Sequence, residues 1–106
     1  MRRIAWSHAS LRDFRNIISY IAERNPIAAE SVSRRLLETV DALGRIPAGR
    51  PGRVSGTYEK VVAGLPYIVA YKLGTDLDGS ETVYLLRIIH GARDWTRDRW
   101  PEEETP

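Results

Sequence analysis

The feature that most restricts the fold is a pair of amphipathic helical patterns with almost no chain between them. Over residues 7–24, and again from residue 26 to about residue 45, apolar side chains recur at spacings of three or four. Asn25 followed by Pro26 predicts an N-cap and a first helical position. Two helices joined this closely must form an antiparallel hairpin. The apolar positions are Leu11, Phe14, Ile17, Ile18 and Ile21 in the first helix, and Ala29, Val32, Leu36, Val40 and Leu43 in the second.

Each helix has only one apolar stripe, so the hairpin needs a common cover, and strand patterns in the rest of the chain can supply it as a sheet. Short strands are expected over residues 2–6, 58–63, 67–73 and 82–90. Residues 44–57 hold four glycines, two prolines and three arginines, and we expect no regular element there. The sequence therefore predicts an α+β fold of order β-α-α-β-β-β, a helical hairpin on a small antiparallel sheet. Val69 and Leu85 should be buried under the hairpin.

The last strand is the most apolar run in the chain, and we expect it to lie centrally in the sheet. Simple alternation assigns its side chains to two faces. One face would carry Val83, Leu85, Arg87 and Ile89, and the other would carry Tyr84, Leu86, Ile88 and His90.

Length and composition exclude several classes of protein. The 106 residues suit one domain, placed at residues 1–100, followed by an acidic tail at 101–106 that we expect to be disordered and dispensable. Cysteine is absent, which excludes disulfides and thiolate chemistry. No apolar run approaches a membrane span and the first residues do not resemble a signal peptide, so we expect a cytoplasmic protein with no membrane partner. No metal-ligand spacing and no glycine-rich nucleotide loop occurs, so no metal and no cofactor is expected.

Arginine dominates the charge. The chain has a net charge of +2, and removing the three glutamates of the tail raises it to +5. Such an excess of arginine over lysine favours bidentate recognition of carboxylate or phosphate, although a GC-rich genome would produce the same excess without a function. Arg45, Arg50 and Arg53 lie close together in the glycine- and proline-rich stretch. They form either a phosphate-contacting edge or an ordinary solvated loop.

Two further candidates lie in the last strand. Arg87 interrupts an apolar run, so it either faces solvent or pairs with an acid such as Glu59. His90 ends the strand, and Arg93 follows three residues later. As a functional pair they would supply a general base and a cation that stabilises a phosphorane. The alternative is a structural histidine bonded to backbone.

The segment at residues 91–100 combines arginines with Trp95 and Trp100 and has no apolar stripe. Tryptophan is enriched at interface hot spots. We expect this segment to serve a target-binding surface, with Trp95 packed against the domain and Trp100 nearer to solvent.

Together these motifs resemble the ParE/RelE family of toxins from bacterial type II toxin–antitoxin modules, which arrest growth and stabilise plasmids. The resemblance covers nearly the whole chain, and the order of the motifs carries it. They are Trp6 with Ala9, residues 20–22 with 25–29 at the helix junction, residues 49–54 in the loop, 66–71 in the middle strand and 86–93 at the end.

The resemblance implies a helical hairpin on a sheet, an acidic and partly disordered antitoxin as partner, and one of two activities. RelE-like toxins are metal-independent ribonucleases that cut mRNA on the ribosome, and by resemblance Arg93, His90 and Arg53 would be catalytic. ParE-like toxins inhibit DNA gyrase. Ile68 stands where RelE-like enzymes usually place an arginine, and Glu59 and Val61 stand where some place lysines, which favours the ParE-like function.

A third alternative is a degenerate toxin that only binds its antitoxin. In each case the residues expected to bind antitoxin or target are Arg50, Arg53, Arg87, Arg93, Trp95 and Trp100.

Overall fold

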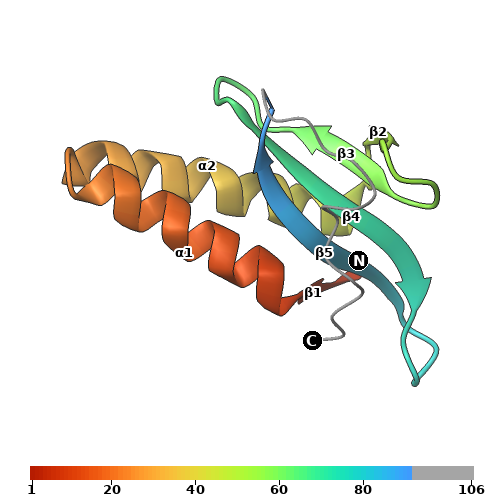
Figure 1. Cartoon of the computed structure of the whole chain (residues 1–106). Coiled ribbons are helices and arrows are strands. Elements are labelled where there is room, and N and C mark those ends of the chain that lie inside the picture. The colour runs from red at the N-terminus through yellow and green to blue at the C-terminus, as the bar shows by residue number, and fades with distance from the viewer. Residues whose placement is uncertain (92–106) are drawn as a thin grey trace.

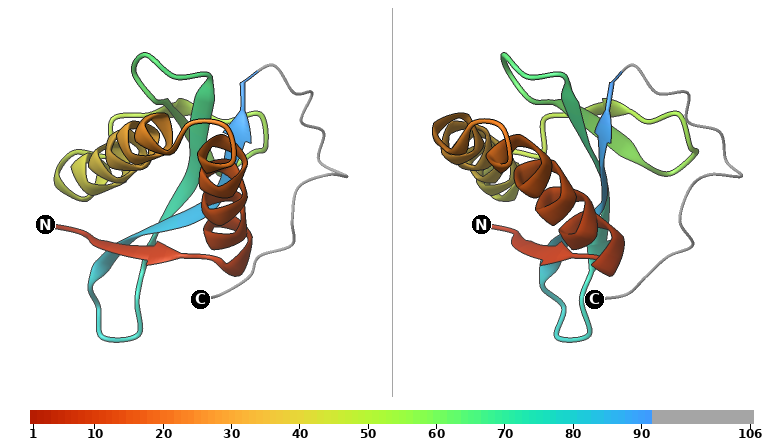
Figure 2. Two further views of the ribbon diagram at one scale, coloured as in Figure 1. Left: turned by 90° about the vertical axis from the view of Figure 1, so that its left-hand side faces the viewer. Right: turned by 60° about the vertical axis from the view of Figure 1, so that its left-hand side comes forward.

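In the computed structural model, which describes residues 1–91, two helices pack side by side on a five-stranded sheet (Figures 1 and 2). The predicted α+β fold is confirmed, and the predicted elements occur in the predicted order, with one further short strand, β2, between α2 and β3. The elements are β1 (Arg3–Trp6), α1 (His8–Ala22), α2 (Pro26–Arg45), β2 (Arg50–Pro51), β3 (Tyr58–Val61), β4 (Tyr67–Thr75) and β5 (Glu81–His90).

Side-chain caps set where both helices begin. The Ser7 hydroxyl accepts the Ser10 N–H at 3.0 Å, and the Asn25 side chain accepts the Ala28 N–H at 3.0 Å. These bonds satisfy amide groups that the first turn of a helix leaves without a partner. α2 has the predicted bounds, whereas α1 is shorter than residues 7–24 at both ends. No helix in residues 1–91 is long and apolar enough to cross a membrane.

The strands follow the order β1-β5-β4-β3-β2. β1 pairs with β5 in parallel, and the other pairs are antiparallel. The sheet is therefore mixed rather than purely antiparallel as predicted, and its middle strand is β4, with β5 internal beside it. The glycine- and proline-rich stretch holds the two-residue strand β2, so the expectation of no regular element there was wrong.

A bulge interrupts the simple alternation in β5. Ala70 pairs with Arg87 but Tyr71 pairs with Leu85, so Leu86 is an extra residue. After the bulge the faces exchange, and Ile88 joins Val83 and Leu85 in the core cluster. The prediction that Arg87 shares a face with Val83 and Leu85 was wrong for this reason.

The core lies between α2 and the centre of the sheet. Leu36, Val40 and Leu43 of α2 are buried, and they cluster with Val69 and Leu85 as predicted. α1 contributes less than its pattern suggested. Ala9 is buried, but the residues of its predicted apolar stripe are only half-buried, with Phe14 and Ile18 packed against the edge of the cluster. The other predicted core residues, Leu11, Ile21 and Val32, are half-buried as well.

Candidate functional site

Glu59 in β3 is a buried acid that holds the arginine-rich loop. Its side chain is only 2% exposed, and Oε2 accepts the backbone N–H of Arg53 at 2.8 Å. The Arg53 Nε lies 3.7 Å from Oε1, and an Arg50 nitrogen lies 3.6 Å from the same oxygen. A buried carboxylate must be compensated in this way. One carboxylate thus brings two of the predicted site residues together.

The turn between β2 and β3 fixes how this loop reaches Glu59. The Gly52 N–H donates to the Thr57 carbonyl at 2.8 Å, and the Thr57 hydroxyl donates to the Val54 carbonyl at 2.6 Å. A Cβ at position 52 would collide with the Thr57 hydroxyl, so a glycine is required for this closure. Arg50 keeps 59% of its side chain exposed and can still meet a charged partner.

Register places four residues in one row across the sheet: Arg50 pairs with Glu59, Glu59 with Ala70, and Ala70 with Arg87. Paired residues project from the same face. Ala70 follows Val69 of the core, so the row projects from the face opposite the core, and only Arg87 at its end reaches a helix, at Asp13 of α1. The row has an arginine at each end and a carboxylate between them, and its cations are therefore partly neutralised within the fold.

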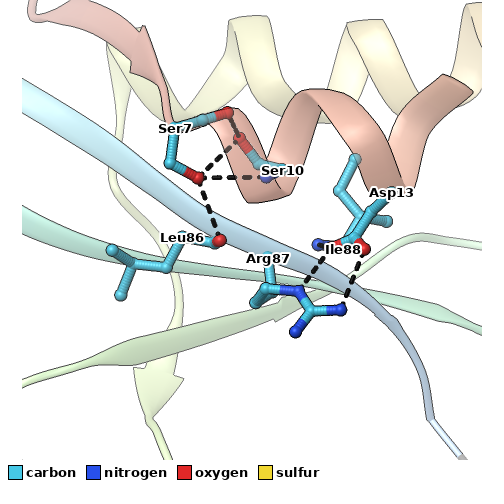
Figure 3. A network of polar contacts seen from close by, with 6 residues as sticks. All are labelled: Ser7, Ser10, Asp13, Leu86, Arg87 and Ile88. Atoms are coloured by element: carbon cyan, nitrogen blue, oxygen red, sulfur yellow. Dashed lines mark hydrogen bonds and ion pairs between the residues drawn. The ribbon is translucent and has the colours of Figure 1, made fainter. Parts of the chain in front are cut away.

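Arg87 does not pair with Glu59, as the sequence suggested, but with Asp13 of α1 (Figure 3). Its Nε donates to Asp13 Oδ2 at 2.6 Å, and Nη2 donates to Oδ1 at 2.9 Å. This bidentate geometry is the strongest form of arginine–carboxylate pair. The side chains are 22% and 13% exposed, so the pair is largely shielded from water.

The same acid also closes the edge of β5. β1 pairs with β5 only as far as Leu85, and beyond that point α1 takes over. Asp13 Oδ2 accepts the Ile88 N–H at 2.9 Å, and the Ser7 hydroxyl donates to the Leu86 carbonyl at 3.0 Å (Figure 3). The side chains of Asp13 in α1 and of its N-cap Ser7 thus replace the missing strand. Arg87 is therefore part of the contact between α1 and β5.

His90 lies away from the loop arginines. It pairs with Tyr67, and the two rings meet edge to face with centroids 5.8 Å apart. Alternation from Ile88 places it on the helix-bearing face, opposite the row of Arg50 and Glu59. His90 lines a groove of about 500 Å³ beside α1, together with Arg12, Asn16, Tyr20 and Tyr67.

Among the predicted site residues, the structure therefore brings Arg50 and Arg53 together at Glu59, and it places Arg87 and His90 along one groove beside α1, away from that loop. Arg93, Trp95 and Trp100 lie outside the described residues. Across residues 1–91, no group of three histidine or acidic side chains is placed to hold a metal ion.

Sequence reasoning missed Asp13, a polar residue of α1 outside its apolar stripe. The sequence offered one weak signal for it. Asp13 is an acid in a helix that was predicted to pack on the sheet, and Arg87 interrupts an apolar strand of that sheet. Lys60 was also missed. It pairs with Val69 on the core-facing side of β3 and lines a groove beside α2.

Residues 4–95 match a family model described as the ParE toxin of the type II toxin–antitoxin system parDE. The Sinorhizobium fredii protein Y4kP is 38% identical over 95 residues, which cover 89% of this chain and 93% of that protein. Toxin RelE2 of Caulobacter vibrioides is 30% identical over 93 residues, covering 88% of this chain and 99% of the relative.

Solved structures give the same fold. A chain of the chromosomal ParDE toxin–antitoxin system from P. aeruginosa aligns with a TM-score of 0.74 at 20% identity, over 85% of this chain and 96% of that one. The RelBE2 complex of Mycobacterium tuberculosis gives a TM-score of 0.52 at 22% identity, over 84% and 96%. The family match spans nearly all of the fold described above, and the chain belongs to the ParE/RelE family as a toxin of a type II toxin–antitoxin system.

Proposed function

We propose that this toxin arrests growth by inhibiting DNA gyrase rather than by cutting mRNA. The observation that carries the proposal is the state of the outer sheet face. Arg50 and Arg53 lie against buried Glu59, and Arg87 lies against Asp13. Neutral or acidic side chains occupy the other strand positions where RelE-like enzymes place cations, namely Glu59, Val61 and Ile68.

The chemical requirements of metal-independent RNA cleavage support this choice. It needs a proton acceptor and unneutralised cations around one scissile phosphate. Arg53 is held at Glu59, whereas His90 pairs with Tyr67 and projects from the opposite face of the sheet, an arrangement that does not favour their joint action on one phosphate. A gyrase inhibitor needs no such assembly, because it acts by occupying a surface of its target.

A RelE-like endonuclease is the second candidate, and one observation favours it. The relative in Caulobacter vibrioides, 30% identical to this chain, is named Toxin RelE2. In that case Arg93, His90 and Arg53 would carry the cleavage. A toxin that only binds its antitoxin is the third candidate.

Two assays on the purified toxin separate the candidates. We expect inhibition of gyrase supercoiling in vitro and intact mRNA on translating ribosomes. In cells, DNA synthesis should stop first, followed by filamentation and the DNA-damage response. Ribosome-dependent cleavage that Arg93→Ala and His90→Ala abolish would instead establish the endonuclease. If expression causes no growth arrest, the third candidate remains.

The proposed partner is an antitoxin with an acidic segment that folds on binding. The structural neighbours come from ParDE and RelBE2 toxin–antitoxin systems, which supports this partner class. Co-expression with the small gene beside the toxin gene should restore growth and yield a complex that co-purifies. If the product of that gene neither binds nor rescues, the antitoxin proposal fails.

A further inference from the structure

The groove beside α1, which we call the α1–β5 groove, is large enough to hold a small molecule. Its volume is about 500 Å³, and small-molecule sites in proteins range over about 300–1,000 Å³. Arg12, Asn16 and Tyr20 line it from α1, and Tyr67 and His90 line it from the sheet. Most of these side chains can bond to a ligand or stack on one.

Three of the lining residues follow one another along α1. Arg12, Asn16 and Tyr20 are spaced by four, so they lie on one face of the helix. The distance along the axis from the first to the third is about 12 Å, at a rise of 1.5 Å per residue. The groove therefore offers a cation, then an amide, then an aromatic ring, over a length that suits a base and its phosphate.

The aromatic rings of the groove are held by the fold although they remain accessible. Tyr20 is 61% exposed, but the Arg24 guanidinium lies over its ring, 4.0 Å from the centroid, and donates to the Tyr20 carbonyl at 3.1 Å. Tyr67 and His90 support each other edge to face. Rings that are fixed before binding lose little conformational freedom when a ligand arrives. They are platforms on which a planar base can stack.

The α1–β5 groove also keeps an excess of positive charge. Asp13 is the one acid among the described residues that line it, and both of its carboxylate oxygens accept hydrogen bonds from Arg87 (Figure 3). Arg12 forms no ion pair with any side chain of residues 1–91. Because the acid is neutralised within the fold and Arg12 is not, the groove favours an anionic ligand such as a phosphate.

We propose that the α1–β5 groove binds a nucleotide. The base stacks on the ring of Tyr20, the polar edge of the base bonds to the Asn16 amide, and the phosphate pairs with Arg12. A planar ring, a hydrogen-bonding edge and a phosphate occur together in nucleotides, and the groove offers one group for each. The nucleotide is either free in solution or part of a single strand of nucleic acid.

This site is distinct from the place of RelE-like cleavage. Val61 and Ile68, which stand where those enzymes place cations, pair with each other. Ile68 precedes Val69 of the core, so the pair projects from the face opposite the core, whereas α1 lies on the core-facing side. Nucleotide binding beside α1 is therefore independent of whether the toxin cuts mRNA.

NMR titration of the full-length toxin tests the site with AMP, with inorganic phosphate, and with an oligothymidylate about ten nucleotides long, a length typical of single-strand sites. AMP represents the free nucleotide, and the oligothymidylate represents the strand. Tyr20→Ala removes the ring, Tyr20→Phe keeps it, and Arg12→Glu reverses the charge. Arg34→Glu is the matched control, because Arg34 is an exposed helical arginine outside the groove and the change in net charge is the same.

We expect the amide shifts caused by AMP or the oligothymidylate to centre on residues 12–20, 67 and 88–90. Arg12→Glu should weaken binding about tenfold or more, because it replaces an attraction by a repulsion. Tyr20→Ala should weaken it about fivefold or more through lost stacking. Tyr20→Phe should bind like the wild type, and Arg34→Glu should lose much less than Arg12→Glu. A higher affinity for the oligothymidylate than for AMP identifies the ligand as a strand, and equal affinities identify it as a free nucleotide.

Three results would overturn the inference. If inorganic phosphate binds as tightly as AMP, the groove holds an anion only. If Arg34→Glu weakens binding as much as Arg12→Glu, the attraction is diffuse surface charge. If neither AMP nor the oligothymidylate shifts the amides of the groove, there is no nucleotide site. Unfolding midpoints of each variant identify any loss caused by misfolding. The test needs neither gyrase nor antitoxin, so its failure leaves the proposed function standing.

Discussion

The two edges of the sheet differ in how the backbone beyond a short outermost strand is covered. On each side the outermost strand is too short: β1 covers β5 only as far as Leu85, and β2 covers β3 only as far as Glu59. Beyond β1, α1 closes the edge of β5 with Ser7 and Asp13. Beyond β2, helix α2 reaches the backbone only past the end of β3, where Arg35 donates to the Ala63 carbonyl at 3.3 Å.

The two edges also differ in their charged side chains: at one edge the charge stabilises the fold, and at the other it remains available to a partner. At the closed edge, Arg87 is fixed by two hydrogen bonds to Asp13 and belongs to the fold. At the unfinished edge, Lys60 lines a groove and forms no ion pair within residues 1–91. A charge that the fold does not use is the better candidate for contact with a partner.

The largest expected effect is at the closed edge. Asp13→Ala removes the partner of the Arg87 guanidinium and of the Ile88 N–H. We expect a loss of about 2–4 kcal/mol in the free energy of unfolding, because one change leaves a largely buried cation and a backbone donor unsatisfied. Urea denaturation measures it. Asp41→Ala, at an exposed pair with Arg45, is the control and should cost less than about 0.5 kcal/mol. Equal losses for the two variants would contradict the closed-edge interpretation.

Glu59→Ala should have the next largest effect, and a more local one. The Arg53 N–H loses its acceptor, but Arg50 and Arg53 can turn to water, so we expect a loss of about 1–3 kcal/mol in the free energy of unfolding. Amide exchange in residues 50–57 should accelerate while the core of β4 stays protected. Glu59→Gln retains an oxygen that can accept the Arg53 N–H and should keep most of the protection. Uniform acceleration across the sheet would show instead that Glu59 supports the whole fold.

Tyr71 links the core to the start of the arginine-rich loop, and its effect depends on pH. Its hydroxyl donates to the Pro47 carbonyl at 3.1 Å, so Tyr71→Phe should cost about 1 kcal/mol of folding free energy at neutral pH. Burial raises the pKa of Tyr71 above its ordinary value of 10.0. A raised folded-state pKa gives stability that is complete below the unfolded pKa and declines as the pH rises above it. Wild type should therefore lose stability above about pH 10 more steeply than Tyr71→Phe. Parallel curves for the two proteins would contradict this.

Local signals in the sequence were enough to predict the helical hairpin and the order of elements. Pro26 after Asn25 marked the start of α2 to the residue, because capping chemistry is local. The bulge at Leu86 was beyond such reasoning, since an extra residue in one strand leaves alternation unchanged in the sequence. It nevertheless decided which face Arg87 occupies. The Asp13–Arg87 pair joins residues 74 positions apart, so the acid could not be selected before the packing of α1 on β5 was known.

No pattern in the sequence predicted the groove beside Lys60. A lysine in a strand is ordinary, and its place depends on how far α2 extends over the sheet. Arg50 and Arg53 were predicted to act together and do lie together, because the glycines and prolines of their loop confine them to a short path.

The smallest expected effect concerns the far end of the closed edge, where β1 meets the turn between β4 and β5. Arg3 lies 2.8 Å from Asp78 and 3.7 Å from Asp76, with all three side chains well exposed. Hydrogen bonds from Ser80, and then the charge of Arg3, lower the pKa of Asp78 below its ordinary value of 3.8. A lowered folded-state pKa gives stability that is present above the unfolded pKa and is lost as the pH falls. Arg3→Ala should raise the pKa of Asp78 only part of the way back, because the Ser80 bonds remain, whereas Ser80→Ala should raise it further. Carboxyl NMR titration distinguishes the two, and a larger rise for Arg3→Ala would mean that the ion pair, rather than the turn, dominates at this exposed end.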